Sequence, residues 1–227
     1  MSSMTIVGGA ALGIAVGLLL VPLTRRELAG AVARTSDSSS IDEVAPPAPV
    51  RAWEWAALGA VSGILPAYVL HKVGWSLIAF PPLLLLVGLI QLGYCDLTRR
   101  LLPKTMVYAL SAAVIVSGVV IAGVMHEWGR LEVACIGGAA FFTLFFIMNL
   151  LNPRWLAFGD VRLSLVVGFG LAWVSWMALF EGFFFANLVA SIVGLGLMAL
   201  HRAGRRTAVP FGLYLAIGTA LVLVTWS

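Results

Sequence analysis

Apolar runs of membrane length recur along this chain, and a short polar stretch ends each of them. An α-helix needs about 20 predominantly apolar residues to cross the hydrocarbon core of a bilayer. The runs that approach this length are, with approximate bounds, Met4–Leu23, Trp53–Leu70, Trp75–Cys95, Thr105–Met125, Leu131–Leu151, Val161–Phe180, Gly182–Leu200 and Val209–Trp226. The pattern therefore predicts an all-α polytopic membrane protein with about eight transmembrane helices.

The composition agrees with this interpretation. Hydrophobic residues make up 61% of the chain and charged residues 11%, which is far too apolar for a soluble domain. Two local features mark the spans. Pro81 and Pro82 fall a third of the way along the third predicted span, and Glu181 separates the sixth from the seventh.

The basic residues predict the orientation, because Lys and Arg concentrate in cytosolic loops. If alternate loops share a side, only Lys72 and Arg130 lie on one side. The other side holds Arg25, Arg26, Arg34, Arg51, Arg99, Arg100, Lys104, Arg154, Arg162, Arg202, Arg205 and Arg206. We therefore predict that both termini lie outside and that this second side is cytosolic. The same distribution accounts for the net charge of +4, so we do not expect nucleic-acid binding.

One extended polar region interrupts the apolar pattern. Residues 24–52 include the runs Ser36–Ser40 and Ala45–Pro49 and few apolar side chains, a composition that cannot form a core. We predict a first transmembrane helix over residues 1–23, a flexible cytosolic linker over 24–52 and a membrane core over 53–227.

Glycines recur at fourfold spacing in two predicted spans. Gly9, Gly13 and Gly17 form one series, and Gly59 and Gly63 form a shorter one. Such spacing is typical of helix faces that pack closely in membranes. Glycine is also common in membrane helices generally, so the spacing does not decide between close packing and general abundance.

Two aspartates stand where a polar loop meets an apolar run. Asp96 ends the third predicted span and Asp160 opens the sixth. One round trip across the membrane separates them, so we expect both to return to the same face at similar depth. Because a charged group at the edge of a bilayer is costly, each is a functional-site hypothesis.

Two adjacent carboxyl groups do not readily both ionise, so they share a proton. One then acts as a base toward water while the other, protonated, polarises a carbonyl, which is the chemistry of an aspartic peptidase. The two positions alone also fit three different roles. Asp160 could cap a helix, Asp96 could pair with Arg99 or Arg100, or the two carboxylates could form the relay of a proton-coupled transporter.

Three segments carry a family resemblance. Asp96 followed by Leu102–Pro103, the segment Phe158–Leu163 and the closing segment Val209–Gly218 resemble, in order, the signatures of the type IV prepilin peptidases. This family, also called leader peptidases, belongs to the GxGD-type membrane aspartyl proteases. The resemblance implies cleavage of a short basic leader from a prepilin or pseudopilin precursor at the cytoplasmic face of a prokaryotic cytoplasmic membrane.

The resemblance also implies site residues. Asp96 and Asp160 occupy the positions of the family's catalytic pair, and Arg162 stands where Lys is common. Supporting or substrate-binding roles are implied for Gly159, Arg162, Pro103, Pro210 and Gly212. Ala157 replaces the first Gly of GxGD, so a catalytically silent pilin-binding homologue is an alternative.

Longer family members carry a cysteine-rich cytosolic domain between the first two spans, associated with zinc binding and with N-methylation of the new pilin terminus. Here that interval is the polar linker of residues 24–52, which has no cysteine. The sequence therefore predicts a peptidase of the short form, without this zinc domain, and gives no support for methyltransferase activity. We expect no metal or other cofactor, and membrane lipid and the pilin precursor as the partners.

Overall fold

The computed structural model describes residues 52–73, 76–99, 104–152, 158–199 and 211–225. Within them it contains seven α-helices, one short 3₁₀ helix and no strand. The elements are α2 (Ala52–Val73), η1 (Leu77–Ala79), α3 (Phe80–Arg99), α4 (Lys104–Met125), α5 (Trp128–Leu151), α6 (Phe158–Val174), α7 (Trp176–Ala199) and α8 (Phe211–Thr225). The predicted all-α fold class is confirmed for this part of the chain. The first predicted span and the linker lie outside it, apart from Ala52, which opens α2.

Four segments of the described residues are long and apolar enough to cross a membrane. They are Leu77–Tyr94, Lys104–Met125, Trp128–Leu151 and Trp176–Gly196, and a shorter apolar segment, Leu213–Thr225, follows near the end of the chain. The chain thus has the helices of a membrane protein. The total of eight spans and the position of the termini stay predictions.

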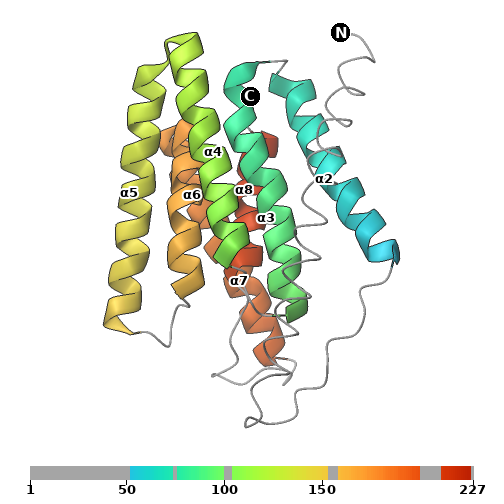
Figure 1. The fold of residues 1–227 in the computed structure, drawn as a ribbon. Coiled ribbons are helices and arrows are strands. Elements are labelled where there is room, and N and C mark those ends of the chain that lie inside the picture. The colour runs from blue at the N-terminus through green and yellow to red at the C-terminus, as the bar shows by residue number, and fades with distance from the viewer. Residues whose placement is uncertain (1–51, 74–75, 100–103, 153–157, 200–210, 226–227) are drawn as a thin grey trace.

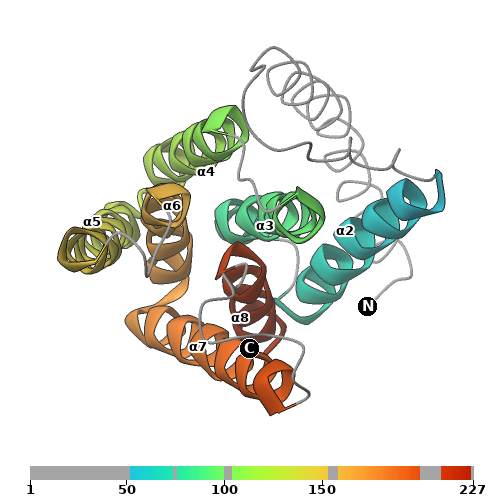
Figure 2. The ribbon, with the colours of Figure 1, turned by 90° about the horizontal axis from the view of Figure 1, so that it is seen from below.

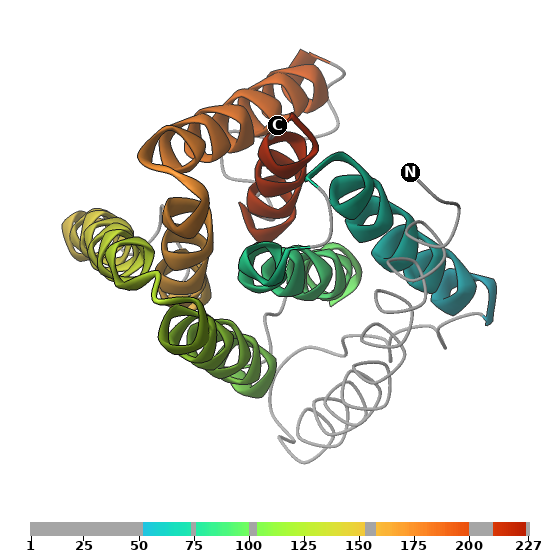
Figure 3. The same cartoon turned by 90° about the horizontal axis from the view of Figure 1, so that it is seen from above.

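The helices alternate in direction along the bundle (Figure 1). As a result α2, α4, α6 and α8 begin at the end of the bundle where α3, α5 and α7 finish. Viewed along the bundle from either end, α3 is central, with α2, α4, α6 and α8 around it (Figures 2 and 3). Helix α5 packs on the outer side of α6, and α7 packs on α8 and α6.

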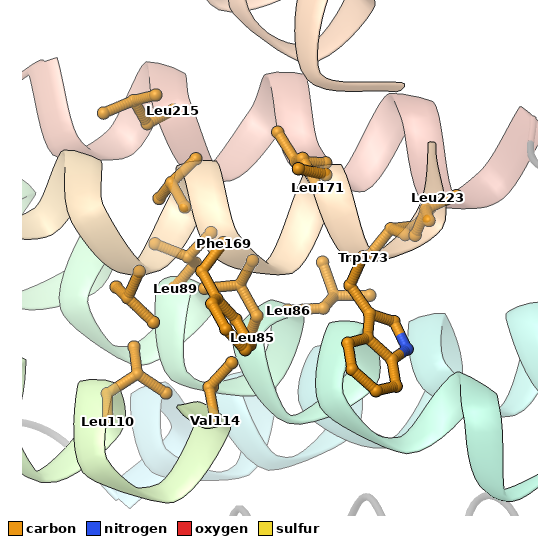
Figure 4. Close-up of a cluster of buried hydrophobic side chains, with 14 of the residues drawn as sticks. Leu85, Leu86, Leu89, Leu110, Val114, Phe169, Leu171, Trp173, Leu215 and Leu223 are labelled. Atoms are coloured by element: carbon orange, nitrogen blue, oxygen red, sulfur yellow. The ribbon is translucent and has the colours of Figure 1, made fainter. Parts of the chain in front are cut away.

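The apolar core lies between α3 and the helices around it (Figure 4). Leu85, Leu86 and Leu89 of α3 are each at most 1% exposed, and they belong to one cluster with Leu171 and Trp173 of α6. Further members come from α4 and α8. The packing of these side chains fixes α3 against α6, the two helices that carry the predicted aspartates.

Glycines bring two pairs of helices into backbone contact. A Cβ atom at Gly168 of α6 would lie 2.8 Å from the carbonyl oxygen of Gly137 and 3.1 Å from Cα of Gly138, both on α5. A Cβ atom at Gly218 of α8 would meet the carbonyl oxygen of Gly182 on α7. Only residues without a Cβ permit such approach.

The sequence did not identify these glycine contacts. The fourfold spacing of Gly59 and Gly63 had left close packing undecided, and a Cβ at Gly59 would have no atom within 4 Å. A close-packing role for Gly59 is therefore wrong with respect to the described helices. The series Gly9, Gly13 and Gly17 lies outside the described residues. Spacing alone cannot tell a packed glycine from one that faces outward.

The third predicted span is shifted along the chain. Helix α3 begins at Phe80, so Pro81 and Pro82 fall in its first turn rather than inside it. A proline at this position loses no helical hydrogen bond, because the first N–H groups of a helix have no intrahelical partner. The short η1 element precedes α3, and the Ser76 side chain accepts a hydrogen bond from the Ile78 N–H.

The predicted boundary between the sixth and seventh spans is wrong. Helix α6 ends at Val174 and α7 begins at Trp176, whereas Glu181 lies on the exposed surface inside α7. Ser175 caps α7, since its Oγ accepts a hydrogen bond of 3.0 Å from the Ala178 N–H. A single serine in an apolar run is enough to start a helix, while the charged residue that drew the prediction is accommodated on the helix surface.

Trp173 of α6 contacts the η1 element that precedes α3, and a testable prediction follows from this contact. Its indole Nε1–H donates a hydrogen bond of 2.8 Å to the carbonyl oxygen of Ile78. Replacing Trp173 by Phe leaves that carbonyl without its donor, so we expect the free energy of unfolding in detergent to fall by about 1–3 kcal/mol. Trp176→Phe is the matched control, because Trp176 is 41% exposed. Equal losses in the two variants would contradict this role for the hydrogen bond.

Candidate functional site

The two predicted aspartates lie on neighbouring helices at the same end of the bundle. Asp96 belongs to the last turn of α3, and Asp160 to the first turn of α6. Helices α3 and α6 pack against each other and run in opposite directions, so the last turn of α3 and the first turn of α6 lie at the same end of the bundle (Figure 1). For Asp96 the structure describes the backbone only.

Asp160 is buried, with 6% of its surface exposed. It is the third residue of α6, whose first residue is Phe158. The alternative that Asp160 is the N-cap of this helix is therefore wrong, because a cap residue precedes the first helical residue. Its position in the first turn still places it where the helix dipole favours negative charge.

Most of α6 is enclosed by neighbouring helices, which explains the burial of Asp160. From Val166 to Val174 every residue of this helix is buried. Ser164 is also buried, and its Oγ donates a hydrogen bond of 2.7 Å to the Val161 carbonyl oxygen within the helix. Ser164, four residues after Asp160, therefore forms its hydrogen bond within α6.

Arg162 is directed away from Asp160. Two positions along an α-helix correspond to a rotation of about 200°, and the Arg162 guanidinium lies 4.6 Å from the centre of the Phe158 ring and 5.5 Å from that of Tyr108 on α4. These are cation–π distances. The structure therefore brings Arg162 to α4 and to the surface of the bundle, in contrast to the buried Asp160.

The other predicted site residues fall into two groups. Gly159 is the half-buried second residue of α6, next to Asp160, and Gly212 is the second residue of α8, at the same end of the bundle. Pro103, Pro210 and the substituted position Ala157 lie outside the described residues.

The sequence did not single out Tyr108, and it marked Phe158 only as the first residue of the segment Phe158–Leu163, without a role of its own. Phe158 could have been found, because it precedes Arg162 by four residues and the two therefore share a helix face. Tyr108 gives no local signal, since its contact with Arg162 joins two helices that are distant in the sequence.

Charged side chains gather near the helix ends. In the described helices, Asp, Glu, Lys and Arg residues lie within about two turns of an end, and the central turns carry none. No group of three His, Cys, Asp or Glu side chains that could hold a metal ion occurs among the described residues. A proton relay through the membrane would need ionisable groups along its path, so the described helices do not support the transporter alternative.

Known proteins resemble this chain over most of the described helices. A sequence model of the type IV leader peptidase family matches residues 83–200, a range that contains both Asp96 and Asp160. A protein of Stutzerimonas stutzeri is 27% identical over 166 residues, covering 71% of this chain and 55% of the relative. One of Aeromonas salmonicida (strain A449) is 30% identical over 156 residues, covering 66% and 50%. One of Pseudomonas aeruginosa is 27% identical over 173 residues, covering 72% and 55%.

All three relatives carry the name prepilin leader peptidase/N-methyltransferase. The chain spans about half the length of the curated relatives it matches. No solved structure matches it.

Proposed function

The chain belongs to the type IV leader peptidase family, and on this premise we propose that it is a membrane-embedded aspartic endopeptidase. Its substrates are type IV prepilin-like precursors, from which it removes the short basic leader at the cytoplasmic face. One observation carries the proposal: Asp96 and Asp160 lie at the same end of the bundle, on two helices that pack together and within the range matched by the family. The proposal concerns peptide cleavage and does not include N-methylation.

The reaction needs only the two carboxyl groups and a water molecule. The ionised carboxylate takes a proton from water, whose oxygen adds to the scissile carbonyl carbon while the protonated partner donates a hydrogen bond to the carbonyl oxygen. The tetrahedral intermediate collapses with cleavage of the C–N bond, and the leaving amine takes the proton that the base carboxylate had accepted from water. The pair therefore ends the cycle with one shared proton, as it began.

The helix dipoles suggest how the two roles divide. Asp160 lies at the beginning of α6, where the dipole favours negative charge, and Asp96 lies near the end of α3, where it opposes negative charge. We assign the ionised form, and so the base, to Asp160 and the protonated form to Asp96.

The remaining predicted site residues have supporting roles in this proposal. Gly159 lacks a Cβ beside Asp160, so the backbone can approach the substrate or the partner carboxylate closely. Pro103 and Pro210, which precede α4 and α8 in the sequence, keep the supporting role that the family resemblance implies. Gly212 gives α8 a small residue at the same end of the bundle as Asp160.

The proposed topology has eight spans with both termini outside, in a prokaryotic cytoplasmic membrane. It contains a first span over residues 1–23, a cytosolic linker over 24–52 and the peptidase core over 53–227. In this arrangement the end of the bundle that carries Asp160 faces the cytosol, where the basic leader of a precursor lies.

Co-expression with a precursor tests the activity. A prepilin with an intact basic leader should shorten by the length of that leader when the chain is present and remain full-length with an empty vector. The family resemblance implies a cut that typically follows a Gly, so a precursor in which this Gly is changed to a bulky residue should stay uncut. A precursor that is captured in a pulldown but never cut would support the silent pilin-binding homologue instead, and a precursor neither cut nor captured would contradict both.

A further inference from the structure

One stripe of residues along α6 is not buried. Apart from Gly159, the residues of α6 that are not buried are Phe158, Arg162 and Leu165. Their spacing of four and three residues puts them on one face of the helix. Phe158 is 46% exposed. Asp160 lies on a different side of α6, which is buried.

Helix α4 supplies the rest of this surface. Its Tyr108 is 55% exposed and lies beside the Arg162 guanidinium. Lys104, the exposed first residue of α4, precedes Tyr108 by four residues and so occupies the same helix face. We call these four residues, Lys104, Tyr108, Phe158 and Arg162, the cation–aromatic surface.

The donors of Arg162 are available to a ligand. Among the residues that the structure describes, no hydrogen bond or ion pair engages its guanidinium N–H groups, and the guanidinium contacts the two aromatic rings. A guanidinium that rests on aromatic rings can still offer N–H groups at its edge to an anion, often two at a time. At the border of a bilayer such a charge is costly without an anionic partner.

The chemistry of the surface selects a phospholipid. Aromatic rings at helix ends are typical of the level of lipid head groups. Val119 lies about three turns after Tyr108 on the same face of α4, is 45% exposed and suits an acyl chain. The two cations of this surface, Lys104 and Arg162, favour a head group with net negative charge. A precursor with a basic leader carries the wrong charge.

We propose that the cation–aromatic surface binds the phosphate of an anionic phospholipid, with Arg162 as its main ligand and Lys104 adding charge. Tyr108 and Phe158 hold the Arg162 side chain toward the lipid. The proposal concerns a lipid on the outer surface of α4 and α6, so it does not depend on the proposed peptidase activity.

Native mass spectrometry of the full chain in neutral detergent tests the site, with phosphatidylglycerol and phosphatidylcholine as the probes. The wild type should retain phosphatidylglycerol in preference to phosphatidylcholine by about tenfold, the size expected of one charge-assisted contact. Arg162→Gln should abolish most of that preference. Arg130→Gln is the matched control and should keep it, because Arg130 lies at the opposite end of the bundle and its Nε pairs with Glu127 at 3.2 Å.

Lys104→Gln is a second test, which can be used if Arg162→Gln does not fold. Lys104 is exposed at the start of α4, so we expect its replacement to leave the fold intact. It should lower the preference about threefold, consistent with one surface charge. The proposal would be overturned if the wild type retained the two lipids equally. It would also be overturned if Lys104→Gln, and Arg162→Gln where it folds, kept the wild-type preference for phosphatidylglycerol. Displacement of the lipid by a basic-leader peptide would also overturn it and assign the surface to the substrate.

Discussion

Replacing Asp160 by asparagine is expected to lower the rate of leader cleavage by about 10²- to 10⁴-fold, the usual contribution of a general acid or base. The amide keeps the shape of the side chain but cannot accept a proton from water. The loss should appear in kcat with a small change in KM, since the substrate contacts outside the pair remain. The measurement is a steady-state rate with purified chain and a prepilin precursor in detergent. Asp96→Asn should give a loss of similar size.

Glu181→Gln is the control for this experiment, because it removes a carboxylate of α7 that is exposed and lies near the other end of the bundle. It should cleave at the wild-type rate. Cleavage near that rate by the Asp160→Asn protein would show that Asp160 is structural, and the proposed mechanism would fail.

Replacing Gly168 by alanine is expected to reduce the free energy of unfolding by about 1–3 kcal/mol, as overpacking does in a closely packed core. The added methyl would lie 2.6 Å from Cβ of Phe141 and 2.8 Å from the Gly137 carbonyl oxygen. One of these neighbours is backbone, so α5 and α6 must move apart to admit it. Unfolding in mixed micelles of mild and denaturing detergent measures the effect.

Gly123→Ala on α4 separates this effect from helix propensity. A Cβ at Gly123 would have no atom within 4 Å, so the change should be neutral or stabilise the helix by up to about 1 kcal/mol. If both alanine variants unfold at the wild-type detergent ratio, backbone contact between α5 and α6 does not contribute to stability.

The sequence predicted those helices whose bounds follow from the length of an apolar run. The bounds of α4 and α5 agree with their predicted spans to within three residues. The boundary between α6 and α7 could not be predicted in this way, because it depends on the hydrogen bond that Ser175 accepts at the start of α7. In an apolar run, one capping serine has little effect on the hydropathy pattern but determines where the next helix begins.

The site was predictable in part. Asp96 and Asp160 stood out because a carboxylate beside a membrane span is unusual, and the round trip between them implied the same end of the bundle, as the helix directions bear out. The direction of Arg162 could not be predicted. It depends on Tyr108, which another helix supplies, and contacts between helices leave no periodic signal in the sequence.

The contact between the two aspartate positions is the central claim, and engineered cysteines test it directly. In a chain whose Cys95 and Cys135 are replaced by serine, the pair Asp96→Cys and Asp160→Cys should form a disulfide on mild oxidation in membranes. Disulfide formation requires Cα atoms within about 7 Å. The control pair Arg130→Cys and Asp160→Cys joins opposite ends of the bundle and should not react. Rapid cross-linking of the first pair alone is the result we predict, and a first pair no more reactive than the control would contradict a shared site.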